Sequence, residues 1–139
     1  MINNITFSII KPDALAGGDG AAILCRIVDG GFTIAALKML QMSRMQAERF
    51  YEAHREKLFF SELVDFMSSG PVIVMVLRHH DAVDTFRKLI GNTDPGKADP
   101  GTIRADFGSD VRRNAVHGSD STEDVVKELS YFFSTIEIF

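Results

Sequence analysis

The chain has 139 residues, of which 45% are hydrophobic and 24% are charged, as expected for one ordinary globular domain spanning residues 1–139. The formal net charge of −4 disfavours nucleic-acid binding, which needs a basic surface, although a local basic cluster can still bind a small anion. The sequence shows neither a signal peptide nor a window of membrane-spanning length. It therefore predicts a cytoplasmic protein without a membrane partner.

Hydrophobic periodicity predicts alternating strands and helices along the chain. Alternating apolar residues indicate a strand over residues 5–10, which Pro12 ends because proline cannot donate to a β-ladder. A capping-box pattern at Ser43 predicts a helix through about Glu56. Similar patterns predict strands at 33–41 and 72–77, and helices at 21–29, 60–67, 81–90 and after Ser121. Cys25, in an apolar helical stretch, is expected to fill the core.

Residues 91–118 interrupt this alternation, because Gly, Pro, Asp and Asn are frequent there and no period persists, apart from a possible strand near Val116. A long irregular segment inside a compact domain is more often functional than idle. The element order predicts an α+β fold, a ferredoxin-like antiparallel sheet (βαββαβ) with helices packed on one face. The irregular segment then forms a long loop before His117.

His117 is the main candidate for chemistry, because Gly118, Ser119 and Asp120 follow it directly before a predicted helix. Neutral imidazole is a competent nucleophile toward phosphorus, provided that one ring nitrogen is free and an acceptor fixes the other. Glu128, in the following helix, is a candidate acceptor, directly or through Ser119. On these residues alone, a surface histidine in a turn explains the pattern equally well. The other histidines, His54, His79 and His80, are expected to be structural or solvated.

A phosphate site needs fixed cations and hydrogen-bond donors, and several candidates flank the irregular segment. Lys11 ends the first strand, Arg87 lies on a predicted helix, and Thr93 and Arg104 lie within the segment. Each one alone is more often a solvated side chain. The chain has no Walker A motif and no kinase glycine-rich loop, which excludes the two common nucleotide-kinase solutions.

The residues around His117 resemble the signature of the nucleoside diphosphate kinase family. That signature, Asn-x-x-His-Gly-Ser-Asp-Ser, occurs without a mismatch at residues 114–121, and three further motifs match in the same order: 10–13, 69–72 and 100–107. The resemblance covers nearly the whole chain. It implies a phosphotransferase that moves the terminal phosphate from a nucleoside triphosphate, with ATP the expected donor, to a nucleoside diphosphate. The implied ping-pong scheme passes through phosphorylated His117 and tolerates different bases.

The resemblance also implies roles for individual residues. Ser119 and Glu128 would support His117, and Lys11 would act in catalysis as well as binding. Phe59 would stack on the base, with Val111 on its other face. The positions that would hold the phosphates and ribose are Lys11, Tyr51, Arg87, Thr93, Arg104 and Asn114. Mg²⁺ would arrive bound to the nucleotide phosphates, with no protein metal site, and the chain would form a homo-oligomer, a tetramer or a hexamer.

Leu58 departs from the family pattern, which usually has proline before the stacking aromatic, so the loop that carries Phe59 would be less rigid. Two other functions fit the sequence. One is a nucleotide-binding module that has lost its activity, and the other is a histidine phosphocarrier that passes phosphate to another protein.

Overall fold

The computed structural model describes residues 2–139. The strands are β1 (Ile5–Ile10), β2 (Thr33–Leu40), β3 (Val72–Arg78) and β4 (Val116–Gly118). The α-helices are α1 (Pro12–Ala16), α2 (Gly20–Asp29), α3 (Arg44–Phe50), α4 (Phe60–Met67), α5 (Ala82–Ile90), α6 (Ile103–Phe107) and α7 (Thr122–Phe132). Short 3-10 helices cover Ile2–Asn4, Glu52–His54, Pro95–Lys97 and Thr135–Glu137.

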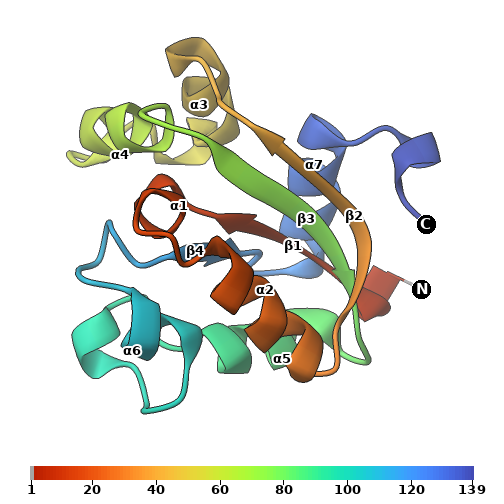
Figure 1. Ribbon diagram of the computed structural model, residues 1–139. Helices are drawn as coiled ribbons and strands as arrows, with labels where there is room; N and C mark the ends of the chain where they lie inside the picture. The colour runs from red at the N-terminus through yellow and green to blue at the C-terminus, as the bar shows by residue number, and fades with distance from the viewer. Residues whose placement is uncertain (1) are drawn as a thin grey trace.

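The four strands form one sheet in the order β2-β3-β1-β4, and every neighbouring pair is antiparallel (Figure 1). This is the ferredoxin-like arrangement predicted from the element order. The short strand β4 pairs with the end of β1, so that His117 lies opposite Ile9. Because Lys11 follows β1 directly, the sheet brings residues more than 100 positions apart to one edge.

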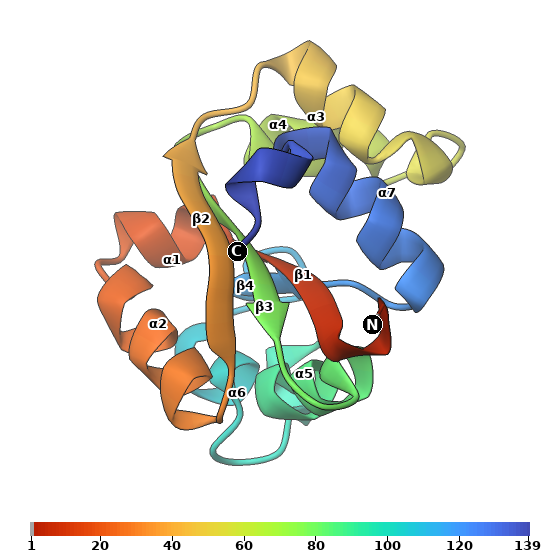
Figure 2. The same cartoon turned by 90° about the vertical axis from the view of Figure 1, so that its right-hand side faces the viewer.

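Helices cover both faces of the sheet, and the expectation of a single covered face was wrong. Figure 2 shows α3, α4 and α7 on one side and α1, α2, α5 and α6 on the other. Each side has its own core: Phe7 and Val74 pack against the first group, whereas Ile10 and Leu77 pack against the second. Burial on both sides explains why all of β1 from Thr6 onward is buried, including its small polar residues. In residues 2–139, no helix combines the length and the apolar character needed to cross a membrane.

Local differences from the sequence predictions have physical reasons. Pro12 ends β1 as expected but also occupies the first turn of α1, where its missing N–H is tolerated. The capping box at Ser43 is present, yet α3 ends at Phe50 and a 3-10 turn replaces the predicted helix to Glu56. Cys25 is exposed on α2, not buried, because Ile23 and Ile27 form the inward stripe of that helix.

Candidate active site

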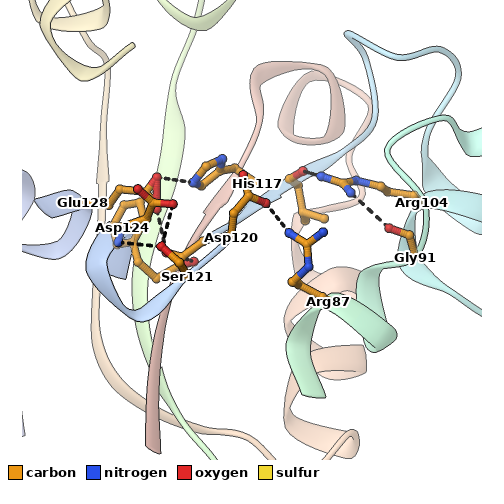
Figure 3. A network of polar contacts seen from close by, with 11 residues as sticks. Arg87, Gly91, Arg104, His117, Asp120, Ser121, Asp124 and Glu128 are labelled. Atoms are coloured by element: carbon orange, nitrogen blue, oxygen red, sulfur yellow. Dashed lines mark hydrogen bonds and ion pairs between the residues drawn. The ribbon is translucent and has the colours of Figure 1, made fainter. Parts of the chain in front are cut away.

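His117 is the middle residue of β4, and its ring is fixed from the side of α7. The ring nitrogen Nε2 lies 2.7 Å from Oε2 of Glu128 (Figure 3). The Ser119 hydroxyl donates to Oε1 of the same carboxylate at 2.6 Å. An ionised carboxylate only accepts hydrogen bonds, so Nε2 carries the proton and Nδ1 keeps a free lone pair. When the ring is neutral, this geometry leaves Nδ1 available for attack.

A strained turn precedes His117. Ala115 has φ +72°, a left-handed conformation that is unusual for a residue with a Cβ, and the Val116 amide donates to the Asn114 carbonyl across it at 2.9 Å. Two contacts hold this turn, one from Lys11 directly after β1 and one from Asp13 in α1. The Lys11 amide donates to the Ala115 carbonyl at 2.9 Å, and the Ala115 amide donates to Oδ2 of Asp13 at 3.1 Å. Asp13 therefore supports the backbone that carries Asn114 and His117.

Lys11 and Asn114 form the buried floor next to this turn. The Lys11 ammonium donates to Oδ1 of Asn114 at 2.7 Å, while Nδ2 of Asn114 donates to the carbonyls of Thr93 and Val111 at 3.0 and 3.1 Å. Burial, reinforced by the charge of Arg104, lowers the pKa of Lys11 to about 7. A nearby anion would restore the charged form, so this lysine is suited to a phosphate ligand.

Two arginines flank the pocket at different depths. The Arg104 guanidinium is buried and donates to the carbonyls of Gly91 and Val116 at 3.1 and 2.9 Å. Burial, followed by the charge of Arg87, lowers the pKa of Arg104 to about 10. Arg87 is half exposed and forms an ion pair with Asp120 (Figure 3). Arg104 is thus fixed by the backbone, whereas the Arg87–Asp120 pair can exchange for another anion.

These residues surround one cavity of about 370 Å³, large enough for part of a nucleotide. Two buried polar atoms of its lining residues have no hydrogen-bond partner within residues 2–139: the Tyr51 hydroxyl and Nε of Arg104. Buried donors are normally satisfied, so unpaired donors at a cavity indicate a ligand. The cavity is lined by Lys11, Tyr51, His54, Leu63, Arg87, Ile90, Gly91, Asn92, Thr93, Arg104, Val111, Asn114, His117, Gly118 and Asp120.

The structure thus brings together eight of the residues singled out from the sequence: Lys11, Tyr51, Arg87, Thr93, Arg104, Val111, Asn114 and His117. Ser119 and Glu128 lie behind the His117 ring. Phe59 does not line the cavity but lies at its margin, where its ring centroid is 5.8 Å from that of His54.

Three residues near the site make contacts that the sequence predictions did not include. His54 was expected on a charged helix face, but α3 ends early and His54 lines the cavity. Asp13 and Arg112 act through contacts with residues 102 and 53 positions away, which no local pattern reveals. For Asp13, its place directly after Lys11 and Pro12 was the one available signal.

Comparison with known proteins agrees with this geometry. The family model described as nucleoside diphosphate kinase matches residues 4–138. The chain belongs to the nucleoside diphosphate kinase family. A nucleoside diphosphate kinase of a Nitratiruptor species is 53% identical over 133 residues, which are 96% of this chain and 97% of the relative. That of Wolinella succinogenes is 54% identical over the same shares of the two chains.

Solved structures of the family have the same fold. The Aquifex aeolicus nucleoside diphosphate kinase superposes with a TM-score of 0.95 at 46% identity, covering 98% of this chain and 99% of that one. The Halobacterium salinarum enzyme, solved in complex with CDP, gives a TM-score of 0.93 at 36% identity, covering 99% and 91%. The family membership suggested by the sequence motifs is therefore confirmed.

Proposed function

We propose that this chain transfers the terminal phosphate of a nucleoside triphosphate to a nucleoside diphosphate through phosphorylated His117. The observation that carries the proposal is the His117–Glu128 contact at the wall of a cavity with buried cations and unpaired donors. Family membership supports the same reaction. ATP is the expected donor. If the nucleotide base is held by stacking, without hydrogen bonds to its edge, the site would accept different bases.

In the first half-reaction, Nδ1 of His117 attacks the γ-phosphorus, an N–P bond forms, and the bond to the bridging oxygen breaks. The diphosphate leaves with the electron pair of that bond. The Glu128 carboxylate opposes the positive charge that develops on the ring, while the proton stays on Nε2. The second half-reaction reverses these steps with another diphosphate as acceptor. Because both halves need the same groups, one site serves donor and acceptor.

The cationic residues would stabilise the transferring phosphoryl group. Lys11, Arg87 and Arg104 supply positive charge, and Thr93 and the Tyr51 hydroxyl supply further donors. Fixed charges of this kind contribute most of the catalysis of phosphoryl transfer, because they need not reorganise during the reaction. Asn114 would act mainly by holding Lys11, since its amide group already has three partners.

We propose Mg²⁺ as the accompanying metal, carried by the nucleotide. Asp120 is the carboxylate among the cavity-lining residues, a set that suits an ion held chiefly by phosphate oxygens and water. When bound, Mg²⁺ would neutralise phosphate charge. A homo-oligomer, tetramer or hexamer, and a cytoplasmic location stay predictions. The apolar side chains of Leu37 and Met39, exposed on the edge strand β2, support self-association, which native mass spectrometry would measure.

Labelled phosphate tests the proposed reaction and its alternatives together. Incubation with γ-labelled ATP should give an acid-labile, alkali-stable phosphoprotein, and GDP should then remove the label as labelled GTP. The His117→Ala variant should not be labelled. Label that remains on the protein after GDP would point to a phosphocarrier. Absence of label from the wild-type protein would leave only a nucleotide-binding module.

A further inference from the structure

The segment from Glu52 to Phe59 carries His54, which lines the cavity, and Phe59, which lies at its margin and is expected to stack on a base. We call this part of the pocket its base end. Nothing in the segment is buried. All eight of its residues are exposed. Its backbone hydrogen bonds are local, such as those from the Arg55 amide to the Glu52 carbonyl and from the Lys57 amide to the His54 carbonyl. Such a segment has little to fix its position relative to the rest of the pocket.

Arg112 is the exception, because it reaches this segment from the long loop. Its Nη1 donates to the Phe59 carbonyl at 3.2 Å, and its guanidinium carbon lies 5.5 Å from the centroid of the Phe59 ring. Its Nη2 is also 3.6 Å from the Glu62 carboxylate. Within residues 2–139, no other hydrogen bond joins residues 52–59 to a residue outside 51–63. Although it lies on a surface loop, the Arg112 side chain is only 20% exposed.

The loop that carries Arg112 is itself fixed to the phosphate end of the pocket. Oδ1 of Asp110 accepts from the amides of Arg112 and Arg113 at 2.9 and 2.7 Å, which closes a tight turn. The carbonyl of Val111 accepts from the Asn114 amide group, and Asn114 in turn accepts from Lys11. A continuous set of contacts therefore runs from Lys11 through Asn114 and Arg112 to Phe59.

We propose that Arg112 is a positioning residue that holds Phe59 at a fixed distance from the phosphate site, so that base stacking and phosphate binding occur together. The inference rests on the proposed function, because it presumes that Phe59 meets a base. Preorganising a mobile segment removes an entropic penalty from binding. A proline before Phe59 would restrict the loop, but this chain has Leu58 at that position. Arg112 supplies a constraint on the Phe59 loop in its place.

Three single variants separate positioning from charge: R112Q, R112K and the matched control R113Q. R113Q removes the same charge, but Arg113 stacks on Phe66 and pairs with Asp110, away from residues 52–59. Each variant is compared with ADP and with ribose 5-diphosphate, which lacks a base, as phosphate acceptors. R112Q should raise KM for ADP about tenfold, the scale of one cation–π contact with one charged hydrogen bond, with little change in kcat.

Comparing the two acceptors distinguishes positioning of Phe59 from a simple charge effect. KM for ribose 5-diphosphate should change less than about twofold in R112Q, because this acceptor does not need Phe59. The KM of R112K for ADP should remain close to that of R112Q, because the lysine ammonium lacks the planar guanidinium group of arginine. R113Q should leave both KM values within about twofold of wild type. An equal loss with both acceptors, or full recovery in R112K, would overturn positioning in favour of a simple charge effect.

Trypsin cleavage tests the same contact without any nucleotide. Cleavage after Lys57 should be several-fold faster in R112Q than in wild type or R113Q, because the segment opens more often. Adding L58P to R112Q should lower KM for ADP again, since the Leu58 side chain is fully exposed and its amide makes no backbone hydrogen bond within the described residues. Unchanged cleavage in R112Q would refute the proposed contact even if the enzyme transfers phosphate. A wild type that is not labelled by ATP would instead refute the proposed function.

Discussion

The two ends of the pocket are built differently. At the phosphate end, Lys11, Arg104 and Asn114 are 7%, 9% and 1% exposed, and their polar atoms, apart from Nε of Arg104, bond to one another or to the backbone. At the base end, Phe59 is 40% exposed and Val111 58% exposed. The first end is held by the sheet and two cores, whereas the second depends on a surface segment and one arginine.

This difference fits the tasks that the two ends would perform. Charges that stabilise a transferring phosphoryl group must stay in place, and burial within a hydrogen-bonded network holds them there. A base that is only stacked needs a planar surface and some room, which an exposed aromatic provides. Substitutions at the phosphate end should therefore affect both stability and kcat, and those at the base end mainly KM.

Arg104→Ala should have the largest effect of the variants that test this contrast. It removes a preorganised charge, so kcat should fall by about 10²–10³-fold. It also leaves the carbonyls of Gly91 and Val116 without their donors, so the free energy of unfolding should fall by about 2 kcal/mol. Steady-state kinetics and urea denaturation measure the two losses. A normal urea midpoint would show that Arg104 is a ligand-binding group without a structural role.

Lys11 should make nucleotide binding depend on pH. Its pKa of about 7 means that it is largely neutral at pH 8, and a phosphate ligand would raise that pKa, so binding should take up nearly one proton. Affinity should then fall by up to about tenfold per pH unit above pH 7. Calorimetry in Tris and HEPES at pH 8 measures the proton uptake, which should disappear in Lys11→Met. Equal binding enthalpies in the two buffers, after correction for the ADP phosphate itself, would contradict this prediction.

The same pKa also fixes the sign of a stability effect. Because the pKa of Lys11 lies below its ordinary value of 10.5, the unfolded chain binds more protons between about pH 7 and pH 10.5. The contribution of Lys11 to the free energy of unfolding therefore rises with pH across that window, by at most about 1.4 kcal/mol per pH unit.

The phosphate end could be anticipated from the sequence better than the base end. Apolar alternation predicted β1, and a possible strand near Val116 was also predicted. The pairing of β1 with β4 places Lys11 beside Ala115, two residues before His117. The short motif around His117 indicated its neighbours. By contrast, the helix predicted to reach Glu56 ends at Phe50, so the placement of His54 and Phe59 could not be derived.

Long-range polar contacts account for most of what the sequence did not reveal. The contact between Arg112 and the Phe59 carbonyl spans 53 positions and follows from the path of two loops, not from any period. The helices on the second face were missed because Thr6 and Ser8 look like solvent-facing residues, although both are buried. Small polar side chains can be buried on either face of a strand, so alternation alone does not show which faces are covered.

Phe59→Ala should have the smallest effect and completes the contrast between the two ends. The side chain is partly exposed and contributes little to either core, so the urea midpoint should stay within experimental error of wild type. Loss of one stacking surface should raise KM for ADP about fivefold and leave kcat nearly unchanged. Phe59→Tyr serves as the matched control, because it keeps the ring. A large fall in kcat would mean that the base end also orients the phosphates, and that the two ends do not act separately.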